Sequence, residues 1–185
     1  MHRTFPCGTN SSLVHCIITR DRSSLDGRLF PTYTLVLEDK KKPMLVASKM
    51  TLNRTSNYHL FDMTRGHVGQ LSKKSGNYVG KLRARDSKRT EYVLLSKSAA
   101  REELAAVHFE RLGMFDQLKE GSQPRRLTVL LPQLDADGVP VPRPTGGDQS
   151  QSLIEWVAAG VSTDSCEGLH KLSSKDPVYE NGNYR

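Results

Sequence analysis

The sequence predicts a mainly β fold, of the α+β kind, in a chain of 185 residues. Short runs rich in branched and aromatic residues recur along the chain and are separated by Gly, Pro, Asp, Asn or Ser. That pattern is typical of a sandwich or barrel built from short strands. The length allows one main core rather than two full domains. A single longer segment has the apolar spacing of a helix.

The expected strands follow one another at short intervals from the N-terminus onwards. They cover residues 13–19, 32–37, 44–47, 58–61, 78–82, 91–95 and 127–131. A further pair of short strands is expected within 178–184, because Asn181-Gly182 is the strongest two-residue signal for a hairpin turn. The sequence stops within the second of these strands, so we expect an incomplete sheet edge at that end.

The expected helix lies at about residues 98–113. Leu104, Val107 and Leu112 form one apolar stripe at helical spacing, Ser98 can cap the start, and Gly113 can end the helix. We expect no second helix with comparable clarity. Trp156 and His108 are expected to be packing residues rather than ligands.

The remaining segments define the expected domain limits. Residues 1–12 are expected to form a disordered N-terminal segment, and residues 13–185 to form the domain. Residues 139–150 are expected to be an exposed loop, because alternate prolines remove ladder donors and the glycines add flexibility.

The charge of the chain is positive and unevenly distributed. It has 27 Lys and Arg against 20 Asp and Glu, a net charge of +7, and a pI near 9.4. Residues 73–89 alone contain seven basic side chains and one acidic side chain, Asp86. A concentrated basic segment attracts phosphate, in a nucleic acid or in a lipid headgroup. A solvated face that binds nothing is equally compatible with the composition.

Several classes of protein are disfavoured by what the sequence lacks. No run approaches the roughly 18 apolar residues of a membrane span, and the N-terminus has no secretory signal. We therefore expect a cytoplasmic or nuclear protein. The three cysteines are too scattered for a disulfide framework and are expected to be reduced. There is no GxSxG, GxxxxGK[ST] or HExxH motif, so we expect no enzyme, no metal and no cofactor.

Several motifs in sequence order resemble the tubby C-terminal domain. They are Arg20-Asp21-Arg22, Leu29-Phe30-Pro31-Thr32-Tyr33, Thr55-Ser56-Asn57-Tyr58, Tyr78-Val79-Gly80-Lys81-Leu82-Arg83, Arg101-Glu102-Glu103-Leu104-Ala105-Ala106-Val107, the strand 127–131 closed by Pro132, and Asp176-Pro177-Val178-Tyr179. The resemblance covers about residues 14–185. It implies a twelve-stranded β-barrel threaded by a hydrophobic C-terminal helix. We expect the barrel to be incomplete in this chain, with the last strands and the central helix missing.

The resemblance also implies a function. The family binds phosphatidylinositol 4,5-bisphosphate at the plasma membrane, and in animals it delivers membrane receptors to cilia. The residues that match its headgroup pocket are Asn57, Lys81, Arg83 and Arg101. The expected partners are thus an anionic phosphoinositide and a membrane-protein cargo. The expected location is the cytoplasm, peripheral to the plasma membrane, with the cilium or nucleus as further sites.

These residue types suit a phosphorylated ring. Lys81 and Arg83 are two apart in a predicted strand, so both side chains leave the same face. Arginine offers a planar fork to phosphate oxygens, lysine a mobile point charge, and the Asn57 amide a donor to a phosphate or a ring hydroxyl. Arg101 is expected in the first helical turn, where a cation is slightly unfavourable unless a phosphate docks there. The alternatives are a solvated strand edge and local pairing of Arg101 with a neighbouring glutamate.

Further basic residues are expected to form a supporting face around this pocket. They are Lys73, Lys74, Arg85, Lys88 and Arg89. Such residues add about 1 kcal/mol each near an anionic leaflet. Two other hypotheses stay open: nucleic-acid binding by the same basic face, and a fragment without function.

Overall fold

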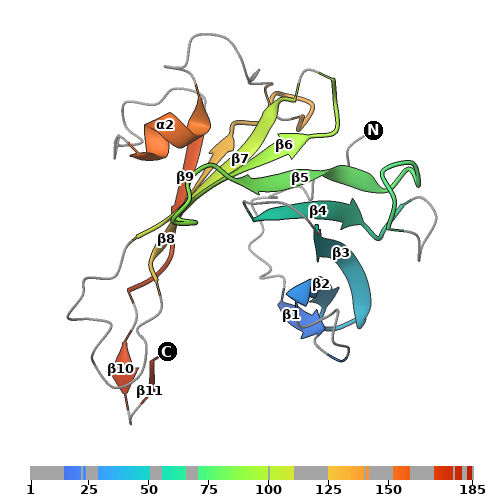
Figure 1. Cartoon of the computed structure of the whole chain (residues 1–185), viewed down its shortest axis with the longest axis horizontal. Coiled ribbons are helices and arrows are strands. Elements are labelled where there is room, and N and C mark those ends of the chain that lie inside the picture. Colours follow the sequence, from blue (N-terminus) through green and yellow to red (C-terminus); the bar gives the residue numbers. More distant parts are fainter. Residues whose placement is uncertain are drawn as a thin grey trace.

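In the computed structural model, nine strands of the described residues form one curved antiparallel sheet. The described residues are 15–21, 23, 29–50, 56–65, 71–99, 101–110, 125–139, 141, 152–158, 169–176, 178–180 and 183–184. The nine strands of the sheet are β1 (Cys16–Asp21), β2 (Thr32–Leu37), β3 (Lys42–Lys49), β4 (Asn57–Asp62), β5 (Tyr78–Ala84), β6 (Glu91–Ser96), β7 (Glu103–Phe109), β8 (Leu127–Pro132) and β9 (Leu169–Ser173). Figure 1 shows how the sheet curls from β1 to β9.

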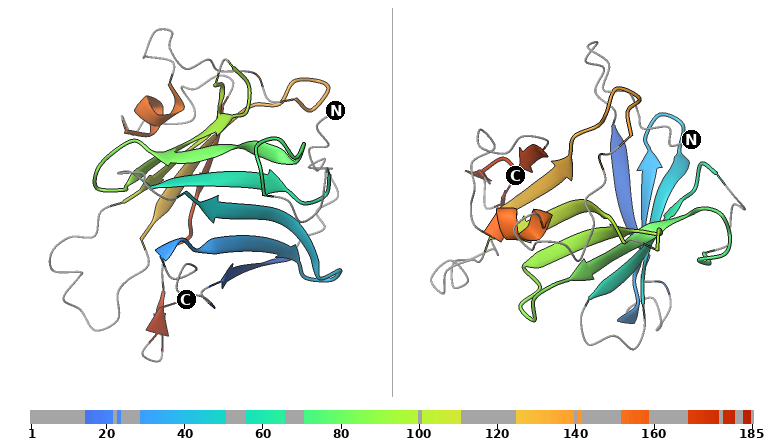
Figure 2. Two further views of the ribbon diagram at one scale, coloured as in Figure 1. Left: turned by 45° about the vertical axis from the view of Figure 1, so that its right-hand side comes forward. Right: turned by 90° about the horizontal axis from the view of Figure 1, so that it is seen from above.

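The strands pair in the order in which they occur in the sequence. Each strand from β1 to β9 is antiparallel to the next, so every connection joins neighbouring strands. The further views in Figure 2, one turned obliquely from Figure 1 and one from above, show the same curvature. Among the described strands, β1 and β9 do not pair with each other, so the sheet is not closed. The prediction of a mainly β fold is confirmed.

All seven internal strands expected from the sequence are present. The prediction for β2 has the observed bounds, and those for β3 to β6 and β8 fall within or near the observed strands. β1 continues to Asp21, while residues 13 and 14 lie outside the described part. The final hairpin is also confirmed: β10 (Tyr179–Glu180) pairs with β11 (Asn183–Tyr184), and Glu180 lies opposite Asn183. The sequence did not lead us to expect β9.

The predicted helix at about 98–113 is wrong. Its described part contains β7 instead, and residues 111–113 lie outside the description. A β-bulge explains the misleading spacing: Leu94 pairs with Ala105 and Leu95 with Glu103, so Leu104 has no opposite residue. The bulge lets Glu103 and Ala106 reach the same face although they are three positions apart. The bulge thus breaks the period-two alternation that would have indicated a strand, so the three-residue spacing of Leu104 and Val107 is interpreted as helical.

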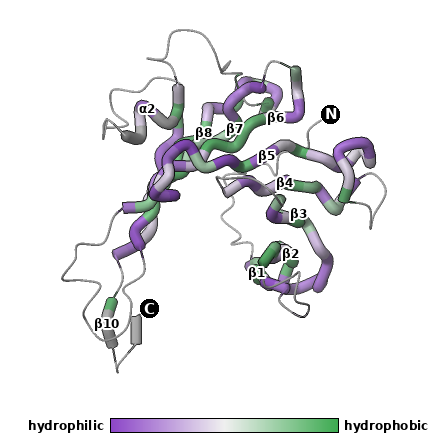
Figure 3. The backbone as a smooth tube through the Cα atoms, viewed as in Figure 1, coloured by the Kyte–Doolittle hydropathy of each residue, from purple (hydrophilic) through white to green (hydrophobic). Residues whose placement is uncertain are grey.

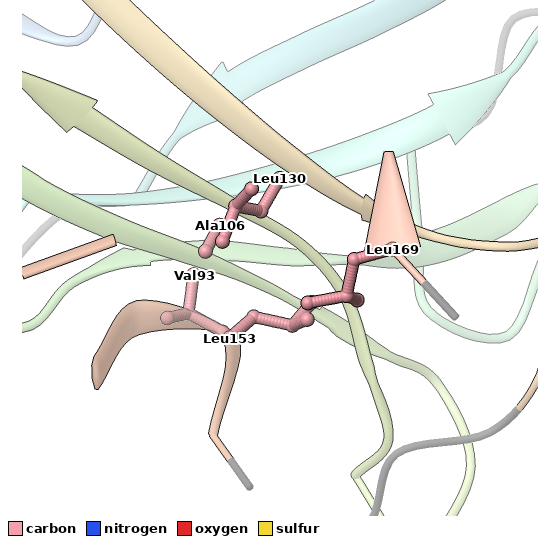
Figure 4. Packing of buried hydrophobic residues seen from close by; sticks show 5 residues of the cluster. All are labelled: Val93, Ala106, Leu130, Leu153 and Leu169. Atoms are coloured by element: carbon pink, nitrogen blue, oxygen red, sulfur yellow. The ribbon is translucent and has the colours of Figure 1, made fainter. Parts of the chain in front are cut away.

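One short helix, α2 (Leu153–Ala158), packs against β6, β7 and β8. Leu153 is fully buried, and Figure 4 shows it with the other members of the hydrophobic core. These are Val93, Ala106, Leu130 and Leu169. Trp156 packs against this cluster, which confirms its predicted role in the core.

A buried carboxylate attaches α2 to the sheet. Glu103 accepts hydrogen bonds from the Leu153 backbone N–H at 2.7 Å and from the Ser152 hydroxyl at 3.0 Å. It thus satisfies a donor at the start of the helix that would otherwise lack an acceptor. Ser152 and Glu155 stand three residues apart, the spacing of a capping box, which is a helix signal that the sequence analysis did not use.

Polarity varies along the chain in step with the strands. Figure 3 shows apolar residues within strands such as β2 and β6, and largely hydrophilic connections between strands. Val139 and Val141 are exposed, as expected at the start of the 139–150 loop, whereas residues 140 and 142–150 lie outside the described part. Residues 1–12 also lie outside it. No helix among the described residues has the length and apolarity to cross a membrane.

Candidate functional site

Two rows of side chains run across the face of the sheet that α2 covers. Directly opposed residues of antiparallel strands project to the same face. The first row consists of Asn57, Arg83, Val93, Ala106 and Leu130. The second row consists of His59, Lys81, Leu95 and Glu103. In both rows the polar end lies on β4 and β5, and the other end lies next to α2.

The pairing of β4 with β5 brings together three of the four residues predicted from the sequence. Asn57 lies opposite Arg83, and Lys81 is two positions before Arg83 on the same face. Arg83 is exposed, while Lys81 and Asn57 are partly buried. The expectation that Lys81 and Arg83 share a face agrees with this register.

Gly80 fixes how closely β6 approaches this part of β5. A Cβ atom at Gly80 would lie 2.0 Å from the backbone oxygen of Leu95, a distance that no side chain could tolerate. The glycine next to Lys81 is therefore required by backbone packing. It holds Lys81 directly opposite Leu95.

The electrostatics around Lys81 indicate that several cations lie together. Burial and the charges of Arg101, Arg83 and Lys73, in that order, lower the pKa of the Lys81 ammonium below its usual value. Like charges that lie close together disfavour one another's charged forms. Arg83 acts on Lys81 from the same strand, Arg101 from the β6–β7 connection, and Lys73 from the turn before β5. We call Lys73, Lys81, Arg83 and Arg101 the cation cluster.

Asn57 lies beside the cation cluster with an unsatisfied oxygen. Its Oδ1 atom is buried and has no hydrogen-bond partner in the described structure. A buried acceptor without a donor is unfavourable by about 1–3 kcal/mol. A ligand with hydroxyl groups could supply the missing donor, and the amide nitrogen could donate to a phosphate oxygen.

Arg101 does not lie in a helix, so the argument from a helix N-terminus is wrong. It lies in the connection between β6 and β7 and has a φ of 49°. A hydrogen bond from Lys97 N–H to the Val79 oxygen at 3.1 Å holds this connection against the start of β5, and one from Ser96 N–H to the Glu102 oxygen at 2.8 Å closes the connection between β6 and β7. This arrangement places Arg101 near Lys81.

The neighbouring glutamates have different partners. The Glu103 carboxylate is buried at the start of α2, as described above. The Glu102 carboxylate accepts hydrogen bonds from the hydroxyls of Ser96 at 3.4 Å and Ser98 at 3.3 Å. Glu102 and Glu103 are the two glutamates next to Arg101 in the sequence. Only the Glu102 carboxylate lies close to the connection that contains Arg101.

Lys73 is held near the cluster by an ordered turn before β5. In this turn Ser75 N–H donates to the Ser72 oxygen at 3.1 Å, and the Ser75 hydroxyl donates to Asn77 Oδ1. Asn77 is fully buried, and its backbone oxygen accepts a hydrogen bond from Asp62 N–H at 2.8 Å. These bonds join the turn to β4, so Lys73 is part of an anchored segment.

Of the other residues of the expected supporting face, Lys74 follows Lys73 in the same turn, and the other three lie in the turn between β5 and β6. Lys74, Arg85, Lys88 and Arg89 are exposed. The turn that contains the last three is held by Asp86, which accepts hydrogen bonds from the Thr90 N–H at 2.9 Å and hydroxyl at 2.7 Å. Arg89 acts electrostatically on Tyr58, which belongs to the opposite face because it pairs with Leu82. The structure therefore joins Lys73 to the cluster and separates Arg89 from it.

His59 is a member of this region that the sequence analysis missed. It is buried, lies opposite Lys81, and contacts the rings of Tyr78 and Phe61 at centroid distances of 5.3 and 6.5 Å. A signal was present, because His59 stands two positions after Asn57 in a predicted strand, as Arg83 does after Lys81. His108 is partly buried in β7, in agreement with a packing role.

Metal-ligand groups do not gather in the described residues. In that part of the chain, no three His, Cys, Asp or Glu side chains lie together as they would around a metal ion. Cys16 is a free thiol on the exposed strand β1. The cation cluster is thus the candidate site within the described structure, and its chemistry is that of an anion receptor.

Comparison with known proteins points to a single family. The model of the Tub family matches residues 4–184. Tubby-related protein 1 of Homo sapiens is 31% identical over 188 residues, covering 92% of this chain and 32% of the relative. Tubby-related protein 3 of Mus musculus is 30% identical over 183 residues, covering 90% and 36%. Protein king tubby of Anopheles gambiae is 33% identical over 178 residues, covering 90% and 36%. The chain spans about a third of the length of these relatives.

Proposed function

This chain belongs to the Tub family, and we propose that it is a tubby-like module that binds a phosphoinositide headgroup and docks reversibly on membranes. The proposed ligand is phosphatidylinositol 4,5-bisphosphate, and the proposed binding residues are Asn57, Lys81, Arg83 and Arg101. No chemical turnover is part of this proposal.

The main support for the proposal is the repulsion between the Lys81 ammonium and the other cations of the cluster. Burial and the charges of two guanidinium groups make the Lys81 ammonium unfavourable in the free chain, as the direction of its pKa shift indicates. A multiply phosphorylated ring would reverse this effect, because each phosphate oxygen attracts the same charges that repel one another. Charge-assisted hydrogen bonds to phosphate are also stronger than neutral ones.

The unsatisfied Asn57 oxygen gives a second, independent argument. An inositol ring presents hydroxyl groups beside its phosphates, so it offers donors as well as acceptors. The buried Oδ1 of Asn57 lacks a donor, and the amide is opposite Arg83 across the strand pair. A ligand that carries both groups suits this position better than a simple anion.

The wider setting of this binding is also part of the proposal. We propose docking at the plasma membrane from the cytoplasmic side, where anionic lipids attract basic surfaces. Carriage of a membrane-protein cargo, with the cilium as a destination, would follow from reversible docking. The exposed basic residues Lys74, Arg85, Lys88 and Arg89 would add a weaker attraction to the leaflet.

Sedimentation with vesicles tests the proposal. Vesicles with about 5% phosphatidylinositol 4,5-bisphosphate are compared with vesicles in which phosphatidylserine supplies the same total charge. The chain should be retained selectively on the first. The double variant Lys81→Ala, Arg83→Ala should lose at least about tenfold in retention, since each contact to phosphate contributes about 1 kcal/mol or more.

A matched control separates the site from net charge. Lys40→Ala with Lys42→Ala removes two exposed charges, one from the β2–β3 connection and one from the first residue of β3, and should keep the selectivity. Equal retention by the site variant and the parent would refute the proposal. Tight binding to duplex DNA with a steep salt dependence, poorly competed by the lipid, would favour nucleic-acid binding instead.

A further inference from the structure

His59 stands at the polar end of the second row, where no role in binding has been assigned to it. Its side chain is on the same face as Lys81, directly across the β4–β5 ladder. Opposed side chains in such a ladder have Cβ atoms about 4.5–5.5 Å apart. An imidazole and an ammonium at that separation can reach the same bound group.

The surroundings of His59 contain cations and rings. From β5 it is opposed by Lys81 and contacts the ring of Tyr78, and from its own strand it contacts Phe61. From β3 it is opposed by the uncharged Ser48. Lys73, in the turn before β5, also acts on it. Burial and then the charges of Lys73 and Lys81 lower the pKa of His59, which favours the neutral imidazole at pH 7.

We propose that His59 is a titratable member of the headgroup site, protonated when an anion occupies the cation cluster, so that headgroup binding strengthens as pH falls. This inference rests on the proposed function and adds to it one residue of the site and the direction in which binding changes with pH. A bound anion reverses the local potential that now opposes the imidazolium. By linkage, a ligand that favours protonation must bind more tightly to the protonated chain.

The size of the effect follows from the same linkage. Each unit by which the bound anion raises the pKa of His59 corresponds to a factor of up to about ten in affinity between high and low pH. We therefore expect binding about threefold to tenfold tighter at pH 5.5 than at pH 7.5. Phosphate monoesters themselves lose charge near pH 6, which works in the opposite direction.

The test therefore uses a ligand whose own charge does not change. Inositol hexasulfate stays fully ionised over this range, and its affinity is measured by calorimetry at about pH 5.5 and 7.5, the two sides of the histidine range. The parent should bind more tightly at the lower pH, and His59→Gln should lose this gain. His170→Gln is the matched control, because His170 is exposed on β9 and opposes Leu131, outside both rows. It should keep the gain.

A direct measurement covers the case in which His59→Gln fails to fold. The pKa of His59 is measured by NMR in the parent chain, with and without inositol hexasulfate, and it should rise on binding. An unchanged pKa, or an equal acid gain in His59→Gln, would overturn the inference.

Vesicle retention at neutral pH keeps the two proposals apart. If phosphatidylinositol 4,5-bisphosphate vesicles retain the parent selectively but acidification has no effect that depends on His59, the inference alone fails. If these vesicles do not retain the parent selectively, the proposed function fails, and the inference fails with it.

Discussion

The two ends of the same rows of side chains differ in what covers them. At one end, Val93, Ala106 and Leu130 are almost completely buried under α2. At the other end, Arg83 is exposed and Lys81 lies partly buried among other cations. One backbone ladder thus supports both an apolar core and a group of like charges. The first end is explained by folding stability, whereas the second is the end to which we assign the proposed ligand.

The energetics of the two ends have opposite signs. Burial of an aliphatic side chain such as Leu153 contributes about 1.5–3 kcal/mol to stability. Placing Lys81 near Arg83 and Arg101 opposes its charged form and contributes nothing favourable to the free chain. Chemistry that is unfavourable for folding is typical of binding sites. The comparison therefore separates residues that stabilise the sheet from residues that we assign to ligand binding.

Gly80→Val should destabilise both ends of the rows, because Gly80 lies on β5 opposite Ser96 of β6, at the boundary between the polar and the apolar end. A Cβ atom there would be 2.0 Å from the Leu95 backbone oxygen, so β5 and β6 would have to separate. We expect a loss of about 3 kcal/mol or more in the free energy of unfolding, measured by urea denaturation. The control Leu82→Val on the same strand should cost only about 1 kcal/mol. A Gly80→Val chain as stable as the parent would contradict the close approach of the strands.

Glu103→Gln should weaken the apolar end alone. The Glu103 carboxylate is 2% exposed and accepts hydrogen bonds from Ser152 and the Leu153 N–H, so the change should cost about 1–2 kcal/mol in thermal or urea unfolding. Glu102→Gln is the control, with longer contacts to two serines and an expected cost below about 0.5 kcal/mol. Equal costs for the two variants would show that Glu103 does not anchor α2.

Lys81→Met should have the smallest effect on stability, although it removes a central binding group. The pKa of Lys81 is lowered in the folded chain, so the folded state binds its proton less readily than the unfolded state. The parent should therefore gain stability as pH rises through the folded pKa toward the usual value of 10.5, and Lys81→Met should lack this gain. At neutral pH the variant should be as stable as the parent or more stable. A large loss of stability at neutral pH would mean that Lys81 serves folding.

The sequence was informative where strands alternate regularly. The register of β4 and β5 needs only period-two alternation, so the shared face of Lys81 and Arg83 could be inferred in advance. The β7 segment could not be inferred in the same way, because its bulge at Leu104 breaks the alternation and imitates helical spacing. Short apolar segments of this kind cannot be assigned from periodicity alone.

Part of the candidate site depended on tertiary structure. Lys73 and Arg101 lie in turns, and their approach to Lys81 results from hydrogen bonds that join each turn to β4 or β5. Neither turn has a local pattern that predicts where its cation lies. The wrong helix also gave Arg101 a role that its positive φ rules out. Its candidacy for the site rested on the family resemblance rather than on local structure.

Titration of the Lys81 ammonium gives the most direct test of the central claim that this end of the sheet is an anion site. The ammonium is followed by NMR in the parent chain, with and without the soluble headgroup inositol 1,4,5-trisphosphate. Without the headgroup, its pKa should lie below the usual 10.5, because of burial, Arg101, Arg83 and Lys73. With the headgroup bound, the pKa should rise to that value or above it. A pKa unchanged at saturating headgroup would contradict the claim.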